Sequence, residues 1–117
     1  MEMTKDMIAW YRFEDEENVG KDSSGNGRDA IAHGAMPPVI REVKGRKALS
    51  LRGKGINQNS YLELPANILN EVTDDEGMCI SFWVSLGKGR NVWERILDFG
   101  KSNMGPYLFL TRNLRAV

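Results

Sequence analysis

The chain has 117 residues, and its sixteen Lys and Arg are balanced by sixteen Asp and Glu. A formal net charge of zero argues against nucleic acid or an anionic membrane as partner, because both are usually bound through a clustered excess of basic residues. The length fits one domain, which we expect to span residues 1–117, and the single cysteine excludes an internal disulfide.

The N-terminal sequence MEMTKDMIAWYRFEDEE contains no apolar stretch long enough for a signal peptide or a membrane span. We therefore expect a cytoplasmic location for the chain as it is written. A secreted or cell-surface location is expected instead if an upstream signal has been removed.

Short apolar runs separated by Gly, Pro, Asn and Asp predict β-strands, because these spacings are too brief for helices. The segment 66–72 can form one helical turn and little more. The expected fold class is all-β, an antiparallel sandwich or barrel. In chain order, the seven predicted strands are 7–13, 30–33, 47–51, 61–64, 79–86, 93–99 and 107–111.

The strand 79–86, CISFWVSL, is the strongest of the seven, and alternation assigns its side chains to two faces. One face is apolar, and the other has two small hydroxyls around a tryptophan, which suits a half-open surface with an aromatic platform or a closely packed second sheet. We expect Cys79 and Trp10 to be core residues. The apolar face consists of Ile80, Phe82 and Val84, and the other face of Ser81, Trp83 and Ser85.

Sugars stack on aromatic rings and bond their hydroxyls to a few polar groups, so Trp residues near strand ends are candidate ligand-binding residues. The candidates are Trp83, and Trp93 together with Arg95 beside the Gly-rich loop 87–91. For Arg95 a structural ion pair with Asp98 is the competing interpretation. Strict alternation places those two side chains on opposite faces of the strand.

Seven motifs in order resemble the laminin-G-like group of the concanavalin A-like lectin/glucanase superfamily, over residues 8–111. The resemblance implies a jelly-roll sandwich of two curved antiparallel sheets. Such domains are often attached to bacterial glycoside hydrolases or cell-surface proteins, where they bind carbohydrate or brace the enzyme. The motifs are WYRFE, DSSGNGRDA, GRKALSLRG, SYLELP, CISFWV, RILDFG and YLFLT.

Members of this family continue for several strands after the element that YLFLT matches. We therefore expect this chain to be an incomplete N-terminal portion of the sandwich. Its open sheets would then be completed by the rest of a longer polypeptide, by a partner chain or by a second copy in a homo-oligomer, because unpaired edges favour association.

The loop KDSSGNGRDA, residues 21–30, begins like a calcium-binding EF-hand loop. Counted from Asp22, oxygen-bearing Ser24 and Asn26 occupy positions 3 and 5, and Gly27 occupies position 6. Position 12, which needs a bidentate Glu, is His33, and no amphipathic helix flanks the loop. The loop is therefore not an EF-hand.

Two interpretations of the loop remain. The resemblance implies a structural calcium ion held between this loop and residues distant in sequence. Alternatively, Asp22 and Asn26 shape a turn by bonding to backbone groups, while Gly25 and Gly27 adopt positive φ. The candidate calcium ligands are Asp22, Ser24 and Asn26, with Glu14 or alternatively Glu16 as a nearby carboxylate.

The family includes retaining glucanases, whose activity would require paired carboxylates on the predicted strands. Retaining enzymes hold their two carboxyls about 5 to 5.5 Å apart. Glu94 and Asp98 are four residues apart and thus separated by about 13 Å along one strand, and Glu63 has no carboxylate two residues away. We expect no enzyme in this chain, but a carbohydrate-binding or accessory module that contacts a polysaccharide or oligosaccharide. The alternative is a structural interaction domain.

Overall fold

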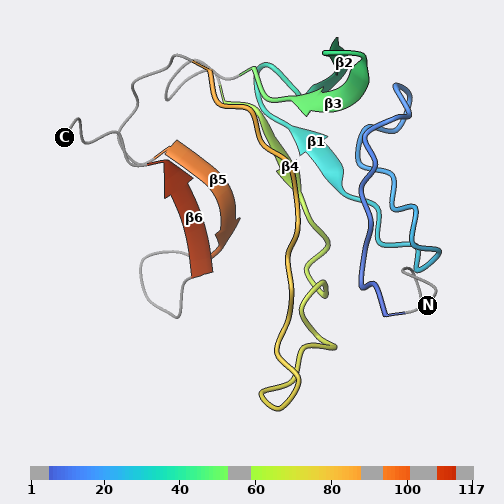
Figure 1. Cartoon of the computed structure of the whole chain (residues 1–117), viewed down its shortest axis with the longest axis vertical. Coiled ribbons are helices and arrows are strands. Elements are labelled where there is room, and N and C mark those ends of the chain that lie inside the picture. Colours follow the sequence, from blue (N-terminus) through green and yellow to red (C-terminus); the bar gives the residue numbers. More distant parts are fainter. Residues whose placement is uncertain (1–5, 53–58, 88–93, 101–107, 113–117) are drawn as a thin grey trace. The chain divides into compact units, whose positions relative to one another are not determined.

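The structure is a computed structural model of the chain, and it describes residues 6–52, 59–87, 94–100 and 108–112 (Figure 1). The chain forms two compact units, Met1–Cys79 and Ile80–Val117, each of which is described by itself below. Within the described ranges, no helix has the length and apolar character needed to cross a lipid bilayer.

The first unit contains two antiparallel strand pairs. β1 (Ile31–His33) pairs with β4 (Tyr61–Glu63), and β2 (Val39–Val43) pairs with β3 (Arg46–Ser50) (Figure 1). The strands predicted at 30–33, 47–51 and 61–64 are therefore confirmed as β1, β3 and β4, with ends that differ by at most one residue.

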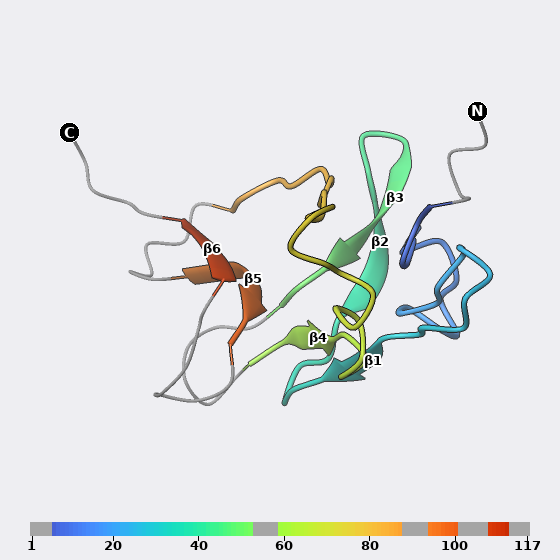
Figure 2. The same ribbon diagram turned by 90° about the horizontal axis from the view of Figure 1, so that it is seen from below.

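β2 was not predicted, although it forms a tight hairpin with β3 (Figure 2). The two-residue loop consists of Lys44 and Gly45, whose φ values are 51° and 78°. Positive φ at both positions is typical of a type I′ turn, the loop whose twist matches that of paired strands. The Lys-Gly dipeptide after the β-branched run of Val39 and Ile40 is the signal that could have identified this hairpin.

The second unit contains one antiparallel pair, β5 (Glu94–Phe99) and β6 (Leu108–Arg112). Arg95 faces Thr111, and the next matched pair is Leu97 with Leu110, so Ile96 is an extra residue in β5. One extra residue on one strand is a β-bulge, which reverses the expected alternation of side chains beyond it. The strands predicted at 93–99 and 107–111 are thus confirmed in their described residues, but the strict alternation expected for 93–99 is wrong.

The all-β fold class is confirmed, since the described parts of the chain contain six strands in three antiparallel pairs and no helix. The segment 66–72 forms a series of turns through bonds such as that from Ile68 N–H to the Pro65 carbonyl, at 3.0 Å. Two predicted strands are absent. Residues 7–13 contribute only an isolated bridge between Tyr11 and Asp22, and residues 79–86 pair with no described strand.

The described residues bury few apolar side chains, and Ala30 is the one hydrophobic residue among them that is buried. Trp10 and Cys79, which were expected in the core, are both exposed. The segments that contain these two residues are not part of a sheet. Their side chains are therefore not packed against a second layer of strands. The prediction of buried positions is wrong for both residues.

Candidate functional site

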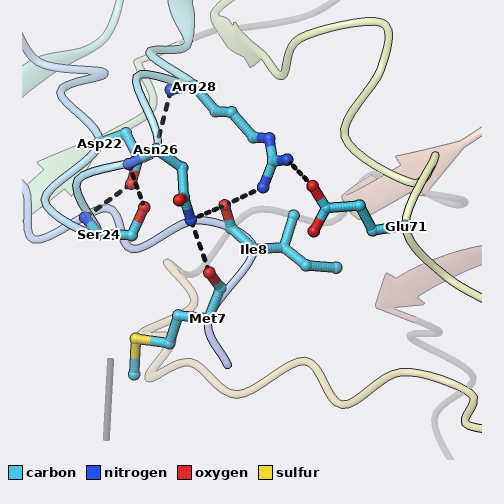
Figure 3. Close-up of polar contacts among 7 residues, drawn as sticks. All are labelled: Met7, Ile8, Asp22, Ser24, Asn26, Arg28 and Glu71. Atoms are coloured by element: carbon cyan, nitrogen blue, oxygen red, sulfur yellow. Dashed lines mark hydrogen bonds and ion pairs between the residues drawn. The ribbon is translucent and has the colours of Figure 1, made fainter. Parts of the chain in front are cut away.

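The carboxylate of Asp22 lies at the centre of the loop 21–30 and is 7 % exposed. Its Oδ1 accepts hydrogen bonds from the backbone N–H groups of Trp10 and Ser24, both at 2.9 Å. Its Oδ2 accepts the backbone N–H of Arg28, also at 2.9 Å (Figure 3). One side chain therefore joins both ends of its own turn to a segment twelve residues earlier.

Asn26 and Arg28 connect the same loop to the N-terminal segment (Figure 3). Asn26 Nδ2 donates to the carbonyls of Met7 and Ile8 at 2.8 and 3.2 Å. Arg28 donates to the Ile8 carbonyl at 2.7 Å and forms an ion pair with Glu71. The amide and the guanidinium thus satisfy carbonyl groups that a neighbouring strand would otherwise satisfy.

Asp29 supports the loop from the other side, although sequence reasoning gave it no role. Its two carboxylate oxygens accept the backbone N–H of Asp22 at 2.9 Å and the side-chain amide of Asn18 at 3.0 Å. The Tyr11 hydroxyl donates to the Arg28 carbonyl at 2.7 Å. The position of Asp29 in the sequence could have identified this role. Asp22 and Asp29 lie seven residues apart on the two sides of a Gly-rich turn, so each carboxylate can accept backbone N–H groups from the other side of the turn.

These contacts shift three pKa values. Burial by itself would raise the pKa of Asp22, but the N–H donors outweigh it and the pKa lies below its ordinary value. The pKa of Asp29 is lowered by the N–H of Asp22 and the amide of Asn18. The pKa of Tyr11 is raised to about 12 by burial and by the negative charges of Asp22 and Asp29.

The geometry provides the bonds that the turn interpretation requires. Three N–H groups converge on the Asp22 carboxylate, and the Ser24 hydroxyl accepts the N–H of Asn26 at 3.2 Å. Glu14 is bonded to Arg12 at 2.9 Å. No group of three or more His, Cys, Asp or Glu among the described residues is arranged to hold a metal ion. A calcium ion on this loop stays a prediction.

A shallow polar groove of about 510 Å³ lies beside this loop. Charged side chains of both signs line it, and several are paired: Lys21 Nζ lies 4.0 Å from Asp15 Oδ2, and Lys47 Nζ lies 4.0 Å from Glu16 Oε1. Opposite charges so close together give the groove little net field, and therefore little selectivity for either a cation or an anion.

Trp83 is the most exposed large apolar side chain in the described parts of the chain, at 98 %. It lies in the segment 79–86, which Figure 1 draws in yellow to orange without a strand arrow. Ser81 and Ser85, two positions before and after Trp83, are exposed as well. The predicted aromatic platform is therefore open to solvent, although the ladder that was expected to support it is absent.

Arg95 forms the structural ion pair that was its competing interpretation. Its Nε lies 3.3 Å from Asp98 Oδ2, and its Cζ lies 3.9 Å from the centre of the Phe109 ring. Regular alternation would separate residues 95 and 98, but the extra residue Ile96 brings them to one side. Trp93, the third candidate, lies outside the described residues.

No protein-family profile, no curated protein and no solved structure matches the chain.

Proposed function

We propose that the chain is a non-catalytic carbohydrate-binding or accessory module, built as a jelly-roll β-sandwich of the laminin-G-like kind. The sequence resemblance supplies this class, including attachment to a bacterial glycoside hydrolase or a surface protein. The observation that supports it is Trp83, which is 98 % exposed and alternates in sequence with the exposed Ser81 and Ser85.

Burying an indole normally stabilises a protein by a few kcal/mol, so a Trp left in water by the fold is a candidate for ligand contact. The flat ring can stack against the apolar face of a sugar. The hydroxyls of Ser81 and Ser85 can exchange hydrogen bonds with the sugar hydroxyls, because alternate residues of an extended segment share a face. Arg95 has a lesser part in this proposal, since its guanidinium is already engaged by Asp98 and Phe109.

Affinity electrophoresis in gels that contain different polysaccharides tests the proposal. We expect at least one polysaccharide to retard the wild-type chain, and Trp83→Ala to weaken that retardation at least tenfold. Trp10→Ala is the control, because it removes an exposed indole that has no part in the carbohydrate proposal, and it should leave binding unchanged. Absence of retardation across a broad panel of plant, algal and bacterial polysaccharides would falsify the carbohydrate proposal.

A second candidate is an interaction domain whose sheets are completed by additional chain. Its supporting observation is the scarcity of buried apolar residues in the described segments, together with exposed side chains such as Leu110 at 46 % and Val84 at 51 %. Domains need a shared core, because burial of apolar surface is the main source of their stability. Light scattering after size-exclusion chromatography tests this candidate, and a well-folded monomer with a cooperative unfolding transition would count against it.

A further inference from the structure

Asn26 and Gly27 form the one Asn-Gly dipeptide of the chain, and both residues are exposed in the loop 21–30. Asparagine is a chemically labile residue, and a glycine after it increases this lability. Because glycine has no Cβ, its backbone nitrogen can closely approach the side-chain carbonyl carbon of the asparagine. Larger residues follow the other described asparagines, for example Ile68 after Asn67.

The backbone N–H of Gly27 has no hydrogen-bond acceptor among the described residues. The N–H groups on both sides of it are engaged: that of Asn26 donates to Ser24 Oγ at 3.2 Å. That of Arg28 donates to Asp22 Oδ2 at 2.9 Å. The φ of Gly27 is +69°, and no atom lies within 4 Å of the place that a Cβ would occupy. The Gly27 nitrogen is therefore unengaged and next to open space.

We propose that Asn26 is a deamidation site, at which the chain itself and water are the reactants. The Gly27 nitrogen gives its proton to a base and bonds to Cγ of Asn26. The bond from Cγ to Nδ2 then breaks, and ammonia leaves after taking a proton from water. Water hydrolyses the resulting five-membered succinimide at either of its two carbonyls, which yields Asp, or isoAsp with the backbone running through Cγ. The net change exchanges an amide for a carboxylic acid, so no oxidant or reductant is needed.

Deamidation removes a contact that holds the N-terminal segment (Figure 3). Asn26 Nδ2 donates to the carbonyls of Met7 and Ile8 at 2.8 and 3.2 Å. A carboxylate in its place has no N–H to donate, and its negative charge repels the same carbonyl oxygens. Arg28 keeps its own bond to the Ile8 carbonyl, at 2.7 Å, so the segment is loosened rather than released. One irreversible reaction in the loop thus makes the N-terminal segment more mobile.

Peptide mapping by mass spectrometry, after incubation of the whole chain in mildly alkaline buffer, tests the site. We expect Asn26 to deamidate about ten times faster than Asn67 and Asn70, which are exposed and belong to the same unit. Gly27→Ala should slow the reaction at Asn26 about tenfold, because the added methyl group hinders the nitrogen. Gly25→Ala is the matched control, since it adds a methyl group at another positive φ in the same loop, +92°, again with no atom within 4 Å. Equal rates at the three asparagines, or equal effects of the two alanines, overturn the proposal.

Amide hydrogen exchange tests the structural consequence. Asn26→Asp imitates one product of the reaction. In this variant the Trp10 N–H, which donates to Asp22 Oδ1 at 2.9 Å, should exchange about fivefold faster than in the wild type. Asn67→Asp is the matched control, because it adds the same charge at an exposed position whose side chain has no recorded partner among the described residues. Equal exchange of the Trp10 N–H in the two variants overturns the loosening of the N-terminal segment, whatever the rate of deamidation.

Discussion

The backbone N–H of Trp10 donates a 2.9 Å hydrogen bond to Oδ1 of Asp22, and the Trp10 carbonyl accepts the N–H of Ser23 at 2.7 Å. A carboxylate thus occupies the place that a backbone carbonyl would have in a regular ladder. This explains why residues 7–13, which have strand composition, form only an isolated bridge. The loop 21–30 is the partner of the N-terminal segment, and the side chain of Asp22 is the main connection.

Replacement of Asp22 by Ala should destabilise the first unit. The change leaves three backbone N–H groups without their charged acceptor. Each such bond contributes about 1.5–3 kcal/mol, but water can reach part of the exposed loop, so we expect a loss of about 2–4 kcal/mol in the free energy of unfolding. Urea unfolding monitored by Trp fluorescence measures it. Asp75→Ala is the control, because that exposed carboxylate has no recorded partner among the described residues, and an equal effect of both variants would refute the role of Asp22.

Acid should weaken the same loop. The pKa values of Asp22 and Asp29 are lowered in the folded chain, so both groups bind protons more readily when the chain is unfolded. Their contribution to stability is therefore complete above the unfolded pKa, about 3.9, and is lost as the pH falls through that value and then through the lower folded values. Thermal unfolding between pH 7 and 2.5 should show a midpoint that falls mainly below pH 4.5. The double variant Asp22→Asn with Asp29→Asn should flatten this dependence; an unchanged slope would show that other carboxylates cause it.

Gly34 should not tolerate a side chain. Its φ is +116°, and a Cβ at this position would lie 2.1 Å from the Asn59 carbonyl oxygen, next to the start of β4. Gly34→Ala must therefore separate the backbone at the β1–β4 pair, and we expect a loss of about 3 kcal/mol or more. Gly25→Ala is a matched control, since φ is +92° but no atom lies within 4 Å of the added Cβ. The control should lose only the conformational term of about 1–2 kcal/mol, and equal losses would contradict the close approach.

The strands that could be predicted are those whose apolar residues and bounding turns lie close together in the sequence. β3 and β5 have short apolar runs bounded by turn residues, and both were found at their expected places. Two features could not be predicted from the alternation of side chains along a strand. The bulge at Ile96 is set by a register between two strands, and it decides whether Arg95 can reach Asp98. The exposure of Trp10 depends on whether a second layer covers its segment, and no local pattern encodes that.

The same limit applies to the loop 21–30, whose residue types predict either a tight turn or a calcium site and do not choose between the two. The hydrogen bonds favour the turn interpretation, because Oδ1 of Asp22 already accepts two N–H groups, which use both of its lone pairs. The positive ends of those donors also oppose a cation at that oxygen.

Calcium should accordingly leave the stability of the loop unchanged. We expect the unfolding midpoint of the wild type to be the same, within about 1 °C, in 5 mM calcium chloride and in excess chelator, since only binding to the folded state raises the midpoint. Magnesium chloride at the same ionic strength is the control for screening of surface charges. A rise of several degrees that is specific to calcium and lost in Asp22→Asn would instead establish the ion site, with Ser24, Asn26 and Glu14 as the next ligands to replace.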